Sequence, residues 1–252
     1  YDLGKKERFN FYKNYPKNTI LFVSDKSEKK YYENYYPKNI KIIPLGFTRL
    51  EKSWIKLIKK NLKKSKNRKR QILILIGKEW YIGKEILIEK FLNILKLAKK
   101  YNYQIKFKYH PRTEQPFLNK AIPLLKSKLI ETQYSVMTES LKSDLVISTS
   151  KSGVCMDCIV VGVPVVEYYT YNNGIKSNMQ NEFIINHKLT SLFKYLGLVF
   201  NVDTNEKLKN FFKNIHNDKF TLRKLAKKQY NSLKKCQYNQ NKVFETFLES
   251  LN

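Results

Sequence analysis

Short apolar runs separated by amphipathic stretches recur along most of the chain. The runs "RQILILIG" (70–77), "DLVISTS" (144–150) and "VPVVEYY" (163–169) are nearly continuous in apolar residues. Such runs are typical of strands that are buried on both faces of a parallel sheet. Residues 84–102 instead space their apolar positions by three and four, which predicts an amphipathic helix.

Predicted strands and helices alternate from residue 70 to about residue 215. That alternation is typical of βαβ units, so the sequence predicts an α/β fold: a Rossmann-like, mostly parallel sheet with helices on both faces. Residues 18–47 hold two further strand-like runs around a predicted helix at 26–36, and resemble the end of another α/β unit. Residues 152–161 and the chain from about residue 204 are also predicted to be helical.

The charge balance adds a preference for anionic partners. The 252 residues carry a formal net charge of +28, and most of the excess is lysine scattered along the chain. A surface of this kind attracts nucleic acid, anionic lipid headgroups or phosphorylated substrates. No apolar run approaches the ~18 residues that span a bilayer. The N-terminus lacks the apolar core of a signal peptide, and we expect it to be a cut inside a longer protein.

Two of the three cysteines, Cys155 and Cys158, form a C-x-x-C motif inside the apolar stretch "GVCMDCIVVG". A zinc site would need about two more ligands, and no second C-x-x-C or paired histidine occurs. A cysteine among apolar residues packs as a small hydrophobe. We therefore predict that both thiols are buried, bind no metal and take no part in catalysis.

Two polar features follow predicted strands. One is His110-Pro111-Arg112 and the other is "STSKSG", residues 148–153, which precedes a predicted helix. Ligands of parallel sheets bind beyond the carboxyl ends of the strands, and a helix start with free N–H groups favours phosphate. Two plainer interpretations stay open: His110 is a turn residue, and Ser150 or Ser152 caps the helix. The P-loop pattern is absent.

The stretch "DLVISTSKSGVCMDCIVVGVPVVEYY" resembles the donor-binding βαβ unit of GT-B glycosyltransferases. Together with the upstream His-Pro, it is similar to bacterial capsule and lipooligosaccharide transferases that use CMP-sialic acid or CMP-Kdo, and to the related CDP-glycerol glycerophosphotransferases. The resemblance covers roughly residues 18–215. It implies four segments: the truncated end of an N-terminal Rossmann-like domain (1–50), a basic linker and helix (51–70), a donor-binding Rossmann-like domain (71–203) and C-terminal helices (204–252).

The resemblance also implies roles for individual residues. His110 matches a histidine that contacts the donor phosphate and stabilises the charge that develops there. The hydroxyl cluster of the loop matches groups that bond the same phosphate, and Asp157 falls where many relatives carry a glutamate directed at the ribose. Arg112 is either a second phosphate contact or an ion-pair partner of Glu114. The implied donor-binding residues are His110, Arg112, Ser148, Thr149, Ser150, Ser152, Gly153 and Asp157.

The expected activity is transfer of a sugar from a nucleotide donor, CMP-linked in preference to UDP-linked, to a surface polysaccharide or lipid-linked glycan acceptor. The resemblance implies no cofactor and no metal. It places the general base in an N-terminal domain that this chain largely lacks, so we expect donor binding without the catalytic base. The expected location is cytoplasmic, peripheral on an anionic inner membrane face, with the basic residues 56–70 in contact.

Two other functions stay open. The first is a CDP-glycerol-type polyol-phosphate transferase on the same scaffold. The second is a basic nucleic-acid-binding module that is not an enzyme. We do not expect nucleic acid as a partner, because arginine is scarce and no recognised nucleic-acid motif is present.

Overall fold

A computed structural model describes residues 19–23, 29, 32–33, 36–44, 52–61, 70–77, 83–110, 130–171, 182–185 and 188–236. The chain divides into two compact units: residues 1–54, 176–178 and 234–252 form the first, and residues 55–175 and 179–233 form the second. The described part of the first unit contains the parallel strands β1 (Ile20–Val23) and β2 (Lys41–Pro44). Its apolar cluster includes Val23, Ile40 and Ile42.

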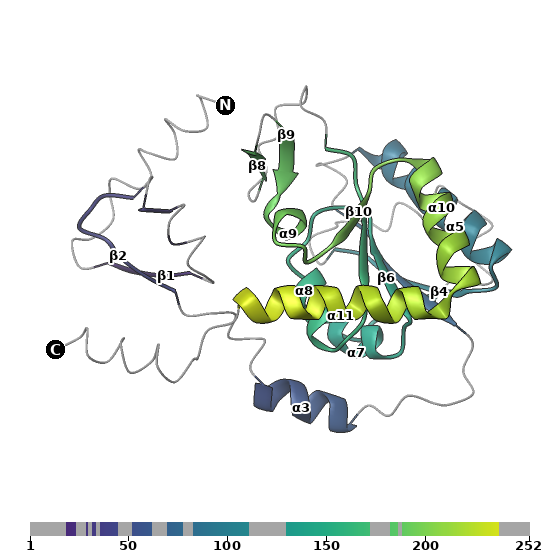
Figure 1. The fold of residues 1–252 in the computed structure, drawn as a ribbon, viewed down its shortest axis with the longest axis horizontal. Coiled ribbons are helices and arrows are strands. Elements are labelled where there is room, and N and C mark those ends of the chain that lie inside the picture. The colour runs from purple at the N-terminus through teal and green to yellow at the C-terminus, as the bar shows by residue number, and fades with distance from the viewer. Residues whose placement is uncertain are drawn as a thin grey trace. The chain divides into compact units, whose positions relative to one another are not determined.

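A six-stranded parallel sheet forms the centre of the second unit (Figure 1). In chain order its strands are β3 (Gln71–Leu75), β4 (Gln104–Lys108), β5 (Ile130–Glu131), β6 (Leu145–Ser148), β7 (Val165–Tyr168) and β10 (Phe200–Val202). In space they lie in the order β10-β7-β6-β3-β4-β5, with every neighbouring pair parallel. This is the Rossmann order, so the direction of winding reverses between β3 and β6.

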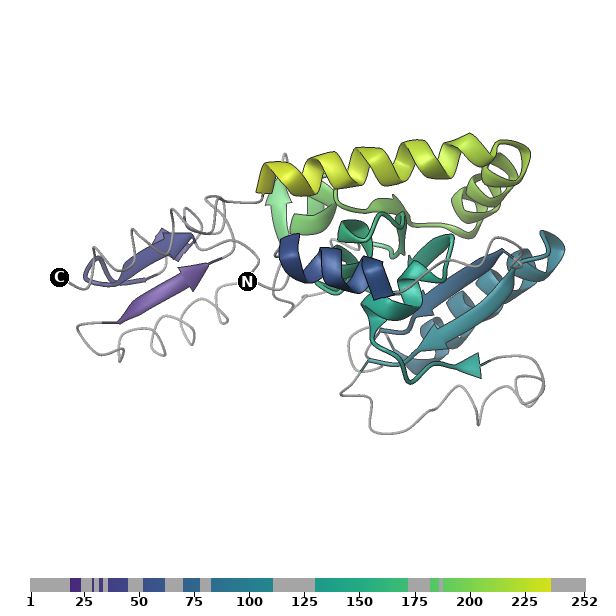
Figure 2. The same ribbon diagram turned by 90° about the horizontal axis from the view of Figure 1, so that it is seen from below.

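Helices cover both faces of this sheet (Figure 2). On one face, Ile105 and Phe107 of β4 share a buried cluster with α5 (Lys84–Lys100) and α10 (Asn205–Asn217). Side chains alternate along a strand, so the intervening Lys106 points the other way. Lys106 bonds α7 (Val136–Leu141), which therefore lies on the opposite face together with α8 (Cys155–Val160). The predicted α/β fold class is confirmed.

The apolar patterns of the sequence account for these packing faces. Every residue of β3 is buried, as a continuous apolar run predicts for a central parallel strand. On α5, the buried positions Leu87, Phe91, Ile94 and Ala98 recur at the three- and four-residue spacing of one helical stripe. Ser135 and Thr204 begin α7 and α10 by accepting hydrogen bonds from backbone N–H groups three residues on.

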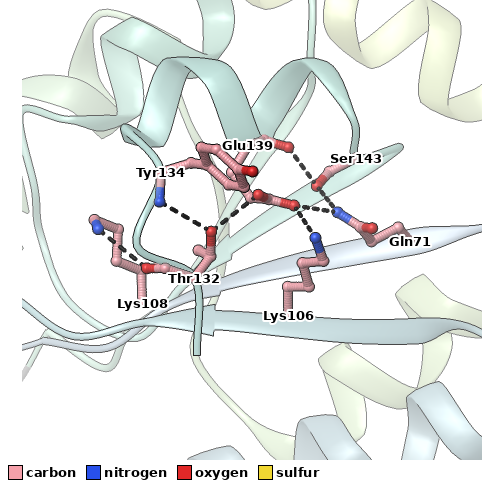
Figure 3. A network of polar contacts seen from close by, with 7 residues as sticks. All are labelled: Gln71, Lys106, Lys108, Thr132, Tyr134, Glu139 and Ser143. Carbon is pink, nitrogen blue, oxygen red and sulfur yellow. Dashed lines mark hydrogen bonds and ion pairs between the residues drawn. The ribbon is translucent and has the colours of Figure 1, made fainter. Parts of the chain in front are cut away.

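A buried carboxylate attaches α7 to the sheet (Figure 3). Glu139 is fully buried and accepts hydrogen bonds from Lys106 Nζ (2.9 Å), Gln71 Nε2 (3.0 Å) and Thr132 Oγ1 (2.9 Å). Gln71 also donates to Ser143 Oγ at 2.8 Å. The carboxylate thus joins β3, β4 and the end of β5 to one helix, and its hydrogen bonds satisfy the buried charge.

Further elements complete the described chain: α3 (Lys52–Asn61), α9 (Leu192–Tyr195) and α11 (Lys219–Cys236). The antiparallel hairpin of β8 (Glu182–Ile185) and β9 (Lys188–Ser191) was not predicted from sequence. Most of the predicted helix at 26–36 lies outside the described residues, as do residues 62–69 of the basic stretch 56–70. Within the described part of the chain, no helix is long and apolar enough to cross a membrane.

Candidate functional site

Hydrogen bonds join the ends of β3 and β6 at the point where the direction of winding of the sheet reverses. Thr149, directly after β6, accepts a hydrogen bond from the Gly77 N–H at 2.9 Å through its hydroxyl oxygen. Its hydroxyl and its backbone N–H both donate to the carbonyl of Leu75, at 3.2 and 3.0 Å. In open parallel sheets this reversal opens the crevice in which ligands bind. Thr149 therefore holds the ends of β3 and β6 together at the position where such sheets bind ligands.

The loop after β6 is shaped by its own hydroxyls. Ser148 is fully buried, and its hydroxyl donates to the carbonyl of Ser150 at 2.6 Å. Thr149 is equally buried, so the first two hydroxyls of the predicted phosphate-binding cluster bond backbone carbonyls. Lys151, Ser152 and Gly153 are half-buried and form the more accessible part of the loop. Direct contact of Ser148 or Thr149 with phosphate stays a prediction.

The start of α8 differs from the sequence interpretation. The helix begins at Cys155 rather than at residue 152, and its N-cap is Val154, which makes no side-chain capping bond. Ser152 and Gly153 instead contribute backbone carbonyls, which accept from the N–H groups of Cys155 and Met156 at 3.1 Å each. The interpretation that Ser150 or Ser152 caps this helix is wrong.

His110 lies two residues beyond β4 and is half-buried. Strands β4 and β6 both pair with β3, so their carboxyl ends lie at the same edge of the sheet, about 10 Å apart. The sheet order thus places His110 and residues 148–153 on either side of the β3 end. Pro111 and Arg112 lie outside the described residues.

Cys155 and Cys158 are buried, as predicted. Burial raises the pKa of the Cys155 thiol well above its usual value, and burial also raises the pKa of Cys158 to about 12. Both thiols are therefore protonated at neutral pH, whereas metal binding and nucleophilic attack need thiolates. Asp157, half-buried on α8, adds a smaller upward contribution to both pKa values. The described residues contain no cluster of three His, Cys, Asp or Glu side chains that could hold a metal.

A buried glutamate at the same edge was missed by the sequence analysis. Glu167 of β7 pairs in register with Ser148 of β6 and is fully buried. The hydroxyl of Tyr171 donates to its Oε1, while Oε2 has no hydrogen-bond partner among the described residues. Burial raises the pKa of Glu167 to about 7, although Tyr171, Lys151, Lys194 and Lys90 oppose that rise. The sequence signal that could have identified Glu167 is the presence of an acidic residue inside the apolar run "VPVVEYY".

A buried lysine of α5, Lys90, approaches the end of β7. The side chain of Lys90, on α5, is only 7% exposed, and its ammonium donates to the carbonyl of Tyr168 at 2.8 Å. Burial lowers the pKa of Lys90 to about 8, against the attraction of Glu167 and Glu89. The sequence analysis did not single out Lys90, because a single lysine among many carries no distinguishing pattern.

Three lysines gather around two tyrosines next to Glu167. The ammoniums of Lys90 and Lys151 lie 5.5 and 5.2 Å from the ring centroid of Tyr169, and that of Lys194 lies 4.7 Å from the ring of Tyr171. The two rings meet edge to face at 5.0 Å. These five residues are called the lysine–tyrosine cluster below.

The second unit therefore has a Rossmann-type architecture, and comparisons with solved structures show that the fold is GT-B-like. No protein-family model matches the sequence, and no curated protein matches it significantly. The chain is similar to a solved structure described as a Staphylococcus aureus MnaA–UDP co-structure, with a TM-score of 0.57 and 14% identity, over 85% of this chain and 58% of that one.

Two further solved structures support the same fold. The crystal structure of TarM gives a TM-score of 0.54 at 13% identity, over 98% of this chain and 46% of that one. A UDP-GlcNAc 2-epimerase from Methanocaldococcus jannaschii, in complex with UDP-GlcNAc and UDP, gives a TM-score of 0.51 at 17% identity. The match covers 86% of this chain and 59% of that one. At these identities the likeness shows the fold, which is GT-B-like. This chain spans about half of the length of the structures that it matches.

Proposed function

We propose that the chain binds a nucleotide-activated donor and serves in glycosyl transfer. The observation that carries the proposal is the reversal of winding between β3 and β6, flanked at one sheet edge by His110 and by residues 148–153. Nucleotides bind at this position in open α/β sheets. The GT-B-like fold and the UDP bound in two of the matched structures support the same assignment.

In this proposal the donor phosphate lies over the loop after β6, with His110 approaching it from the end of β4. Negative charge builds on that phosphate as the glycosidic bond breaks, and a hydrogen bond from His110 would strengthen at the same time. Asp157 and Arg112 are proposed as further donor contacts. We propose a CMP-linked sugar as donor, no metal, and a surface polysaccharide or glycolipid as acceptor, as the sequence resemblance implies.

The test is calorimetric titration of CMP, CDP, UDP and GDP into the wild type and His110→Ala. His110→Ala should weaken binding of the preferred nucleotide by roughly 1 to 3 kcal/mol, the range for a hydrogen bond to a charged group. His216→Ala removes another histidine, exposed on α10, and should leave affinity unchanged. If no nucleotide binds the wild type, the proposed function is wrong. If His110→Ala binds like the wild type, His110 is an ordinary turn residue.

A further inference from the structure

The C-terminal helix α11 carries positive charge without any acidic residue of its own. Its sequence, KFTLRKLAKKQYNSLKKC, contains seven lysines and arginines and no aspartate or glutamate. The cations of the lysine–tyrosine cluster, by contrast, interact with the carboxylate of Glu167. Two of the α11 lysines, Lys234 and Lys235, lie in the last turn, where a positive charge is favoured by the helix dipole. The dipole does not account for the cations in the middle of the helix.

The cations in the middle of α11 form one face, called the basic ridge: Arg223, Lys224, Lys227 and Lys228. All four are exposed, and at about 100° per residue they span an arc of about 140° around the helix axis. The buried Gln229 and Leu233 lie on the opposite side of the helix, which faces the sheet. Among the described residues, the large apolar side chains that are exposed all lie outside α11. The basic ridge therefore presents charge alone, on a helix at the outside of its unit (Figure 2).

The chemistry of the basic ridge favours an anionic bilayer over a nucleic acid as partner. Three of its four cations are lysines, which act as point charges and lack the planar fork with which arginine recognises bases. Groups of about four to eight lysines and arginines on an amphipathic helix are typical of binding to anionic lipid headgroups. A ridge on the outer side of a helix is convex, so a flat surface can approach all of its cations together. We propose that the basic ridge docks the protein on an anionic phospholipid bilayer.

Docking through the basic ridge leaves the candidate nucleotide site open. Gln229 of α11 bonds Val165, the first residue of β7, whereas residues 148–153 and His110 lie at and beyond the carboxyl ends of β6 and β4. The strands are parallel, so these positions lie toward opposite edges of the sheet, about 13 Å apart for strands of four residues. The ridge is also separate from residues 56–70, for which the sequence predicts the same kind of contact. The inference therefore depends neither on nucleotide binding nor on α3.

The experiment measures the affinity of the protein for vesicles that contain phosphatidylserine, at low and at high salt. Arg223→Gln/Lys227→Gln should bind at least about tenfold more weakly than the wild type at low salt, since each cation near an anionic surface raises binding about fivefold. Lys224→Gln/Lys228→Gln removes the other two charges of the ridge and should give a similar loss. Both differences should disappear at high salt, which screens exposed charges. All four positions are exposed, so the variants should fold like the wild type.

Lys209→Gln/Lys213→Gln is the matched control, because it neutralises two exposed lysines with the same spacing on α10. This variant should bind the vesicles nearly as tightly as the wild type. An equal loss in the control and the ridge variants would show that net charge alone acts, and would overturn the proposal. Wild-type affinity in both ridge variants, or a loss that persists at high salt, would also overturn it. If the ridge variants weaken binding to duplex DNA and not to vesicles, the partner is a nucleic acid and the proposal is wrong.

Discussion

At the scale of single residues, the protonation of Glu167 should control the affinity for anions. Its pKa is raised to about 7 by burial, so the carboxyl is largely neutral below pH 6 and ionised above pH 8. The ionised form adds a negative charge beside Lys90, Lys151 and Lys194, which lowers their attraction for phosphate. Affinity for a nucleotide should therefore fall as pH rises through 7.

Glu167→Gln should remove the contribution of Glu167 to this pH dependence, because glutamine stays neutral and can still accept the hydrogen bond of Tyr171. The contribution of Lys90, whose pKa burial lowers to about 8, remains. The variant should bind a nucleotide as tightly as the wild type at pH 6 and more tightly than the wild type at pH 8. The ligand's own phosphate titrates near pH 6 and affects both proteins equally. The informative quantity is therefore the ratio of the dissociation constant of the wild type to that of Glu167→Gln at each pH. A ratio that stays constant from pH 6 to pH 8 would show that Glu167 does not act on the bound anion.

The positions of several site residues could be predicted from the sequence, whereas the directions of their side chains could not. A polar run directly after an apolar strand must lie at the carboxyl edge, which located His110 and residues 148–153 correctly at strand ends. The hydroxyl of Thr149, however, bonds Gly77, which is 72 residues earlier in the chain. That contact depends on β3 and β6 becoming neighbours, and no local pattern specifies it.

At the scale of elements, the attachment of α7 depends on the ionised form of Glu139. Burial alone would raise its pKa, but hydrogen bonds from Lys106, Thr132 and Gln71 outweigh burial and lower it below the unfolded value of 4.5. Glu139→Gln keeps the shape and removes the charge, leaving Lys106 without its counter-ion. The variant should lower the free energy of unfolding by about 1 to 3 kcal/mol at pH 7, measured by urea denaturation.

The pH dependence of stability gives a second readout for the same pair of proteins. A carboxylate whose pKa is depressed on folding stabilises above its unfolded pKa, and that stability is lost as pH falls through the folded value. The difference between the wild type and Glu139→Gln should thus shrink below pH 4.5. Glu206→Gln, at an exposed position of α10, should change stability little at any pH. If the lower stability of Glu139→Gln persists undiminished at acidic pH, the effect is due to packing and not to the charge of Glu139.

Strength of pattern also separated the elements that were predicted from those that were missed. The continuous apolar runs of β3, β6 and β7 predicted buried parallel strands, and all three pair in this way. The β8–β9 hairpin has two four-residue strands, EFII and KLTS, and the second contains a single apolar residue. A hairpin of that length is stable only when it packs on other elements, and its sequence carries correspondingly little signal.

At the scale of the whole molecule, the net charge of +28 should bring the chain to anionic membranes, as we propose for its location. Lys56 and Lys60 are exposed on α3, at the start of the basic run. Attraction to a negative surface grows with each lysine near it and is screened by salt. Flotation with vesicles should show binding to phosphatidylserine-containing bilayers, no binding to neutral ones, and release at high salt.

The variant Lys56→Glu/Lys60→Glu should lower the bound fraction by about tenfold or more, since two attractive charges become repulsive. Lys209→Glu/Lys213→Glu makes the same change of charge on exposed positions of α10 and is the matched control. Equal losses in both variants would mean that net charge alone drives the association. Binding to neutral vesicles as strong as to anionic ones would remove the membrane proposal.

One side chain of the C-terminal helix α11 completes the hydrogen bonding of the sheet. The amide of Gln229 accepts from the N–H of Val165 at 2.9 Å and donates to the carbonyl of Val165 at 2.6 Å, just below the point where β10 begins to pair with β7. The glutamine thus takes the place of one more residue of a neighbouring strand. A shortened chain ending before residue 229 would expose that backbone pair to strands of other molecules, so such fragments should aggregate in preparations where the longer chain remains monodisperse.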